Sequence, residues 1–108
     1  MATTVPTSTS LIAGSFTGTG QSSALAFLGK ANLSLGGTAP VGTVKLERSF
    51  DAGTTYIDVS LDALGTPASY ALNSTEVSLI VEEFEQGVLW RFNCTAYTSG
   101  TITYRLSQ

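Results

Sequence analysis

The side chains best suited to acid–base or metal chemistry in this 108-residue chain are its acids, because the sequence contains no histidine. Glu82, Glu83 and Glu85 form one acidic segment, and Asp58 or Asp62 would have to join it to make a calcium site or a pair of glycosidase carboxylates. Runs of charged residues are usually solvated, so we interpret the segment as an exposed acidic turn. We predict no catalytic residue, no metal site and no cofactor.

Nucleophilic side chains are present, but the groups that would activate them are not. Serine and threonine are abundant, yet there is no histidine to act as a base and no nucleophile elbow, phosphate-binding loop or dinucleotide-binding glycine motif. Cys94 is the single cysteine, so no intramolecular disulfide can form. It alternates in step with Val88, Trp90 and Phe92, which predicts a buried thiol that packs as a small hydrophobe. The sequence therefore predicts a protein that is not an enzyme.

Aromatic side chains offer a further kind of site, because their faces can pack against the C–H edges of sugars. The candidates are Tyr56, Tyr70, Trp90, Tyr97 and Tyr104. Trp90 and Tyr104 fall in step with the apolar positions of their predicted strands, so we expect both in the core. Tyr56, Tyr70 and Tyr97 remain candidate surface contacts.

The composition favours a β protein that packs against other proteins. Charged residues make up only 12% of the chain, against roughly 25% in an average soluble protein. The net charge of −3 provides no field that attracts phosphate groups, so we expect no nucleic-acid partner. The sequence shows no basic, apolar leader and no run of ~20 apolar residues, which predicts folding in a cytoplasm without a membrane span.

The stretch of residues 42–61 organises the predicted fold. Apolar and polar residues alternate in a first run, residues 44–47. In a second run, residues 57–61, Ile57, Val59 and Leu61 alternate with polar residues. A period of two is typical of strands with one buried face. We expect the two runs to pair as a hairpin, with the apolar residues of both on its buried face.

Between these runs lies a turn with the spacing Ser-x-Asp-x-Gly-x-Thr-aromatic. It comprises Ser49, Asp51, Gly53, Thr55 and Tyr56. Asp51 can accept hydrogen bonds from the backbone N–H groups that follow it, and Gly53 can supply the positive φ that a tight reversal needs. The spacing resembles the Asp box of sialidase-like propellers and many other β proteins, with Tyr56 where the pattern usually has Trp. Asp boxes are generally structural, so the resemblance implies that these residues shape the turn.

Turn signals divide the remaining chain into short strands, and no segment shows sustained helical periodicity. The segments with strand character are residues 11–16, 22–28, 30–35, 44–46, 57–61, 69–72, 77–81, 88–97 and 101–106, of which 22–28 also allows a helical turn. This pattern predicts an all-β fold, an antiparallel β-sandwich of about eight strands. A jelly roll and an immunoglobulin-like Greek key both fit. The Trp-x-Phe-x-Cys strand slightly favours the latter, although no second cysteine crosses the sandwich.

The predicted domain organisation is a flexible N-terminal arm of residues 1–10, followed by one β-sandwich domain of residues 11–108. Apart from Met1, the arm holds Val5 as its only large apolar residue. Alone it cannot offset the ~1–2 kcal/mol per residue that ordering the backbone costs. We expect the arm to order against a neighbouring subunit, with Val5 as a candidate contact. Within the domain we expect Leu46, Val59, Trp90 and Ile102 to be buried together.

Two segments together resemble small structural proteins of tailed bacteriophages and prophages. They are GTVKLERSFDAGTTY, residues 42–56, and VEEFEQGVLWRFNCTAYTSGTITYRLSQ, residues 81–108, so the likeness covers about the C-terminal two thirds of the chain. It implies a non-enzymatic virion protein, and our first interpretation is that it decorates or cements the capsid shell. The implied partners are the major capsid protein or another virion protein and further copies of this chain. The implied location is the virion, assembled in the host cytoplasm.

The same resemblance also allows a place on a tail or fibre. The alternative function is then a carbohydrate- or cell-surface-binding module, with surface tyrosines as its contacts. The resemblance supplies no functional residues that would decide between the two.

Overall fold

The structure is a computed structural model that describes residues 11–108, so the expected arm and its candidate contact Val5 lie outside the described residues. All regular structure in residues 11–108 is β-strand, which confirms the all-β prediction. The eight strands are β1 (Leu11–Phe16), β2 (Gly20–Gln21), β3 (Leu25–Ala26), β4 (Gly29–Ser49), β5 (Ile57–Asp58), β6 (Ser69–Asn73), β7 (Val77–Glu83) and β8 (Leu89–Ser107). The described residues include no helix long and apolar enough to cross a membrane.

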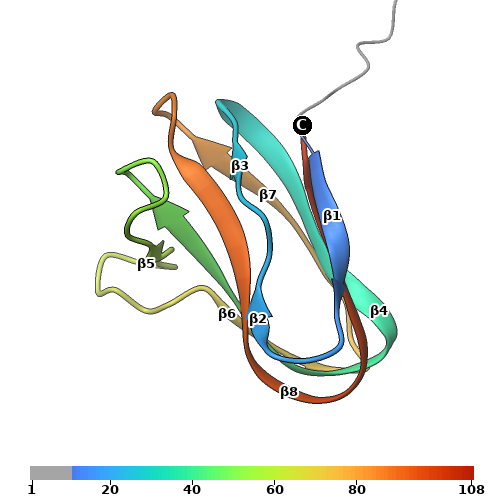
Figure 1. The fold of residues 1–108 in the computed structure, drawn as a ribbon. Coiled ribbons are helices and arrows are strands. Elements are labelled where there is room, and N and C mark those ends of the chain that lie inside the picture. The colour runs from blue at the N-terminus through green and yellow to red at the C-terminus, as the bar shows by residue number, and fades with distance from the viewer. Residues whose placement is uncertain (1–10) are drawn as a thin grey trace, which may run out of the picture.

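Two strands, β4 with 21 residues and β8 with 19, are much longer than the others. They pair antiparallel along nearly their whole length, from Asn32 opposite Ser107 to Ser49 opposite Leu89. Figure 1 shows that this two-stranded ribbon folds over at its lower end, so that its two halves face each other. The sequence predicted separate short strands on either side of glycine-rich turns. In the structure, the predicted strands 30–35 and 44–46 are parts of β4, and the predicted strands 88–97 and 101–106 are joined in β8.

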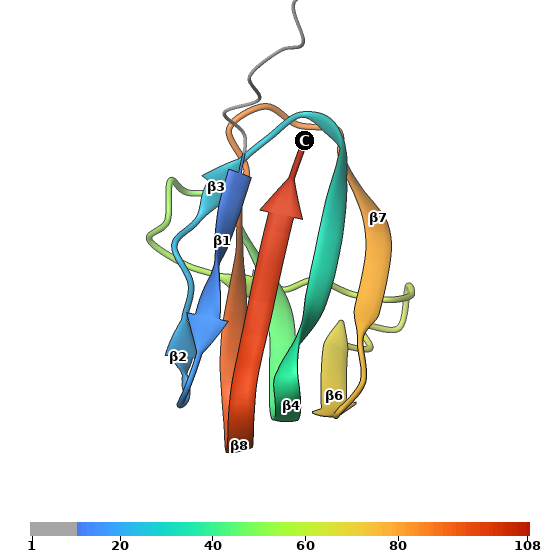
Figure 2. The same cartoon turned by 90° about the vertical axis from the view of Figure 1, so that its right-hand side faces the viewer.

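The bend divides one continuous antiparallel sheet into two layers. In the first layer the order is β1, the second half of β8, the first half of β4, and β7, as Figure 2 shows. The second layer pairs β2 and β3 with the first half of β8, and β5 and β6 with the second half of β4. When each half of β4 and of β8 is counted as a separate strand, the strand order in the two layers is that of a jelly roll. The antiparallel sandwich is therefore confirmed, and the slight preference for an immunoglobulin-like arrangement is wrong.

The bend is built from backbone that approaches too closely for side chains. Register shifts interrupt the β4–β8 pairing between residues 38 and 44, where extra residues increase the local twist. Gly37 has a φ of 119°, and a Cβ there would collide with the carbonyl oxygen of Thr101. Gly100 has a φ of 80°, and a Cβ there would collide with the carbonyl oxygen of Ala39. Glycine is thus required at both positions.

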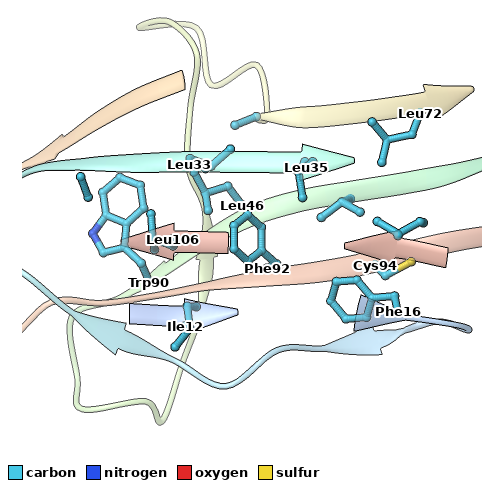
Figure 3. Packing of buried hydrophobic residues seen from close by; sticks show 14 of the residues in the cluster. Ile12, Phe16, Leu33, Leu35, Leu46, Leu72, Trp90, Phe92, Cys94 and Leu106 are labelled. Carbon is cyan, nitrogen blue, oxygen red and sulfur yellow. The ribbon is translucent and has the colours of Figure 1, made fainter. Parts of the chain in front are cut away.

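The core lies between the two layers. Its buried members are Ile12, Phe16, Phe27, Ala31, Leu33, Leu35, Val44, Leu46, Ala68, Leu72, Val88, Trp90, Phe92, Cys94, Ile102 and Leu106. Figure 3 shows Leu33 and Leu35 from the first half of β4 facing Leu46 and Phe92 from the second layer. Leu46, Trp90 and Ile102 are buried as predicted, whereas Val59 is only partly buried against the cluster.

Cys94 is buried in the second layer, as its place in the alternation predicted. Burial raises the pKa of the Cys94 thiol. The thiol donates a hydrogen bond to the carbonyl oxygen of Ala96 at 3.4 Å. A protonated, enclosed thiol is a poor nucleophile. The side chain therefore serves as packing.

The central hairpin is shorter than the alternation predicted. Within it, β5 pairs with β4 only at Asp58 and Ile57, and β6 takes the place beside residues 41–45. Ile57 and Leu61 are exposed, so the expectation that both face the core is wrong. The reason is that β5 is a two-residue strand at the edge of the second layer, and the chain then leaves the sheet for a loop before β6 begins.

The bend makes the first prediction. Gly100→Ala should lower the free energy of unfolding by about 2 kcal/mol or more, because the new Cβ meets backbone and an L residue is strained at this φ. Gly18→Ala is the matched control, since nothing lies within 4 Å of its Cβ position. Urea denaturation followed by Trp90 fluorescence measures both, and equal stability of the two variants would show that the bend tolerates side chains.

Candidate functional site

The end of the sandwich opposite the bend carries three of the connections between strands. These are the β3–β4 connection, the β4–β5 loop and the β7–β8 loop, with the C-terminus beside them (Figure 1). Each connection exposes one large apolar side chain: Leu28 and Phe50 are about half exposed, and Phe84 is 84% exposed. We call Leu28, Phe50 and Phe84 the apolar rim.

An ion pair between the layers, with a buried carboxylate and a partly exposed guanidinium, supports the apolar rim. Glu83, at the end of β7, is only 3% exposed. Its Oε1 accepts hydrogen bonds from Nη1 of Arg48 at 3.0 Å and from Nε1 of Trp90 at 2.9 Å, and its Oε2 accepts one from the backbone N–H of Glu85 at 3.0 Å. Arg48 and Trp90 belong to the second layer, whereas Glu83 belongs to the first. The carboxylate therefore ties the two layers together at this end.

The three rim residues lie around this ion pair. The guanidinium carbon of Arg48 is 4.9 Å from the ring centroid of Phe50 and 5.4 Å from that of Trp90. Gly29, the first residue of β4, is paired with Glu83, the last residue of β7. Leu28 directly precedes Gly29, and Phe84 directly follows Glu83. An open hollow of about 390 Å³ lies beside them, lined by Ala26, Phe27, Leu28, Gln86, Gly87 and Gln108. Phe50 therefore lies against the Arg48 guanidinium, Leu28 and Phe84 lie beside the paired ends of β4 and β7, and the hollow lies beside Leu28.

The charge of Glu83 is well compensated. Burial by itself would raise the pKa of this carboxyl, but the hydrogen bonds from the Glu85 N–H, the Trp90 indole and the Arg48 guanidinium outweigh it and hold the pKa below its ordinary value. The Nε atom of Arg48 has no hydrogen-bond partner within residues 11–108, and aromatic rings lie over this guanidinium instead. The Glu83 carboxylate is therefore satisfied by three donors, and the apolar rim is the exposed apolar surface at this end.

The turn with the Asp-box spacing follows β4 directly and sets the position of Phe50. Oδ1 of Asp51 accepts hydrogen bonds from the hydroxyl of Ser49 at 2.8 Å and from the backbone N–H of Thr55 at 2.8 Å. The Thr55 N–H, and after it the Ser49 hydroxyl, hold the pKa of Asp51 below its ordinary value. The N–H of Gly53 donates to Oγ of Ser49 at 2.9 Å, and Gly53 has a φ of 92°, the positive value that the turn was predicted to need.

Tyr56, the last residue of this pattern, covers a second ion pair on the outer face of the second layer. Its ring centroid lies 3.6 Å from the guanidinium carbon of Arg91. Nε of Arg91 donates to Oε1 of Glu47 at 2.8 Å, and Nδ2 of Asn93 donates to Oε2 of the same carboxylate at 3.0 Å. Tyr56 therefore has a structural partner, which is a different role from a sugar contact.

The other aromatic candidates are separated from one another in the fold. Tyr70 packs partly against the core, and its burial raises its pKa. The hydroxyl of Tyr97 donates to the carbonyl oxygen of Gly100 at 2.6 Å, so this ring braces the bend. The ring centroid of Tyr104 lies 4.9 Å from that of Phe16 and 5.2 Å from that of Phe92, in keeping with the predicted core position.

The acidic residues that the sequence singled out also have separate roles. Glu82 and Glu85 are exposed as expected, but the interpretation of Glu83 as a solvated acid is wrong. Asp58 pairs with Lys45 at 3.3 Å, and Asp62 accepts hydrogen bonds within its own loop. Within residues 11–108 no group of three His, Cys, Asp or Glu side chains could hold a metal ion.

The alternation of residues in β4 and β7 contains a signal for the Glu83–Arg48 ion pair. Glu83 is in step with Val77 and Val81, and Arg48 is in step with Val44 and Leu46, so both charges occupy inward positions of their strands. Two charges of opposite sign at inward positions predict a buried pair. Their separation of 35 residues along the chain hides which acid meets which base.

Comparison with known proteins leaves the function to be argued from this geometry. No family model, curated protein or solved structure matches the chain.

The turn makes the second prediction. Gly53→Val should lower the free energy of unfolding by about 1 kcal/mol or more, because a β-branched residue is strained at this φ. Asp51→Ala should lower the urea midpoint as well, since it removes the acceptor of the Thr55 N–H. Ala52→Gly is the control, because Ala52 has a φ of 59° and glycine relieves its strain. Variants of Asp51 and Gly53 as stable as the parent would disprove the structural role of the turn.

The ion pair makes the third prediction. At pH 7, Glu83→Gln should lower the free energy of unfolding by about 2 kcal/mol, because Arg48 loses its charged partner. A depressed pKa in the folded protein contributes stability above the ordinary carboxyl value of 4.5 and loses it as the pH falls through the folded value. The gap between parent and variant should therefore close toward pH 3. Urea midpoints from pH 7 to pH 3 measure it, with Glu82→Gln, an exposed neighbour, as the control; a gap that is independent of pH would exclude the charge as its cause.

Proposed function

We propose that this protein is a non-enzymatic structural subunit of a bacteriophage particle that attaches to the capsid shell through the apolar rim. The observation that carries the proposal is the exposure of Leu28, Phe50 and Phe84 at the end of the sandwich that the Glu83–Arg48 ion pair holds together. Apolar side chains that are exposed together mark interaction surfaces, whereas singly exposed ones are normal.

The construction of the rim suits tight binding to a protein. Phe50 and Phe84 are aromatic, and large side chains of this kind often supply most of the binding energy of an interface. They stand on β-strand ends and on the hydrogen-bonded Asp51 turn, so little conformational freedom remains to be lost on binding. Charge is neutralised within the site, because Glu83 is bound by Arg48. A partner that covers Phe84 would therefore leave this ion pair intact, and it would meet the exposed carboxylates of Glu82 and Glu85 beside Phe84.

The support for a role in the virion comes from the sequence. Residues 42–56 and 81–108, which resemble small structural proteins of tailed bacteriophages, contain Phe50 and Phe84 of the rim. The jelly roll also occurs in viral capsid and lectin domains, which is a likeness of fold and carries no function by itself. Resemblance and geometry together favour attachment to the major capsid protein or another shell component.

The alternative, a carbohydrate- or cell-surface-binding module of a tail or fibre, has weaker support. It requires aromatic faces that are free to meet a sugar. Tyr56 lies against Arg91, Tyr97 is bonded to Gly100, and Tyr70 packs partly against the core. Each proposed contact therefore already has a partner in the fold. A glycan array tests this alternative directly, and specific binding that Tyr97→Ala abolishes would favour it.

Attachment through the rim makes the fourth prediction. Phe84→Ser should weaken binding to particles assembled without this chain by about tenfold or more, because a buried aromatic contact contributes more than ~1.4 kcal/mol to an interface. Its melting temperature should stay near that of the parent, since Phe84 is exposed. Co-sedimentation with the particles measures binding.

The matched control is Leu64→Ser, because Leu64 is also highly exposed but lies in the loop between β5 and β6. Equal binding of the Phe84 variant, the Leu64 variant and the parent would remove the rim from the mechanism. Mass spectrometry of purified particles tests whether the chain is a component of the particle, since a structural subunit must be present there in stoichiometric amounts.

A further inference from the structure

Strand β7 (Val77–Glu83) forms an open edge of the first layer. Within residues 11–108 it pairs with β4 alone, in an unbroken register from Gly29 opposite Glu83 to Leu35 opposite Val77. Its other side therefore presents a row of backbone N–H and C=O groups. The edge of the second layer is different, because β2, β3 and β5 have only two residues each and β6 has five.

The chemistry of β7 suits the addition of a strand. Natural proteins protect open edges with charged side chains, especially lysine, with proline or with a β-bulge. The segment 77–83 contains neither lysine nor proline, and its pairing with β4 shows no register shift. Its centre, residues 78–81, is uncharged, and Ile80 is 71% exposed. The charges of β7 are confined to its last two residues, Glu82 and Glu83, so residues 77–81 form a regular, uncharged edge that can accept an extended segment through backbone hydrogen bonds.

We propose that residues 2–10 of a neighbouring copy bind this edge as an added β-strand. The segment is rich in threonine, carries no charged side chain and includes Val5, all of which suit a strand. Proline within a sheet is confined to edge strands, because it has no N–H to donate. Pro6 therefore fits an added strand whose outer side stays unpaired, and it would stop the sheet from growing further.

The strand order indicates that the segment comes from a second copy. Residues 1–10 join the domain at Leu11, the first residue of β1, and β1 and β7 are the opposite edges of the same layer. To reach its own β7, the segment would have to cross three strand spacings, about 14 Å, which uses about half of its length. Ten extended residues span about 33 Å, enough to cover the seven residues of β7, about 23 Å, on a neighbour that lies beside β1.

This arrangement joins copies head to tail. Each subunit donates a segment from one edge of its first layer and accepts one at the opposite edge, so the contact is heterologous and generates a closed ring or an open chain. It involves neither Leu28, Phe50 nor Phe84, so it does not depend on what the apolar rim binds.

Disulfide trapping between two full-length variants tests the proposal. One variant carries a cysteine in the segment, placed in turn at Thr3, Thr4, Val5 and Thr7, and the other carries Ile80→Cys. Mixed under mild oxidation, they should form a disulfide-linked heterodimer, with yields that alternate along the segment as side chains of a strand do. The native Cys94 is buried and should stay unreactive.

The matched control replaces Ile80→Cys by Ala71→Cys, an exposed residue of β6 on the edge of the second layer. The expected yield with the Ile80 variant is at least about tenfold higher than with the Ala71 variant, and an excess of a peptide of residues 2–10 should suppress it. Equal yields with the two acceptors, or no heterodimer at any of the four positions, would overturn the proposal. A chain that carries both cysteines and links within itself at high dilution would also overturn it, because the segment would then bind its own edge.

Discussion

The sandwich depends on the single bend that β4 and β8 make together, because these two strands run through both layers. A paired ribbon can fold back on itself only where its two backbones come very close, and Gly37 and Gly100 allow this approach. Register shifts between residues 38 and 44 add the local twist. Once the ribbon has bent, its two inner faces must meet, and the side chains of Leu33, Leu46 and their neighbours become one core.

At the opposite end of the sandwich, residues 11–108 cross between the layers only through the β3–β4 and β7–β8 connections, and side chains add to the hold between the layers. Glu83 from the first layer meets Arg48 and Trp90 from the second. Buried charges are costly unless their hydrogen bonds are satisfied, and three donors satisfy this carboxylate. The charge of Glu83 is thus compensated inside the protein. Outside lie the exposed apolar rim and, beside Phe84, the exposed carboxylates of Glu82 and Glu85.

The same architecture separates two kinds of surface. The apolar rim lies at the end of the sandwich and offers side chains, whereas the open edge of β7 lies along its side and offers backbone groups. Contacts of the first kind are specified by shape and contacts of the second kind by register. A subunit that used both could bind a shell with its end while it binds neighbouring copies with its sides. A low content of charged residues, 12% of the chain, suits a protein that buries much of its surface in this way.

By itself the sequence determined the all-β class, the approximate strands, the Asp51 turn and the buried positions of Cys94 and Trp90, because these follow from alternation and spacing within a few residues. The tertiary structure alone decided the jelly-roll order, since that order depends on which distant segments pair, such as β1 with the second half of β8. It also decided that β4 and β8 continue through the glycines, and that Ile57 and Leu61 stay exposed where no second strand covers them. Glu83 illustrates the difference. The alternation of residues along β7 predicts its inward position, but its partner Arg48 comes from the other layer, and only the folded chain brings the two together.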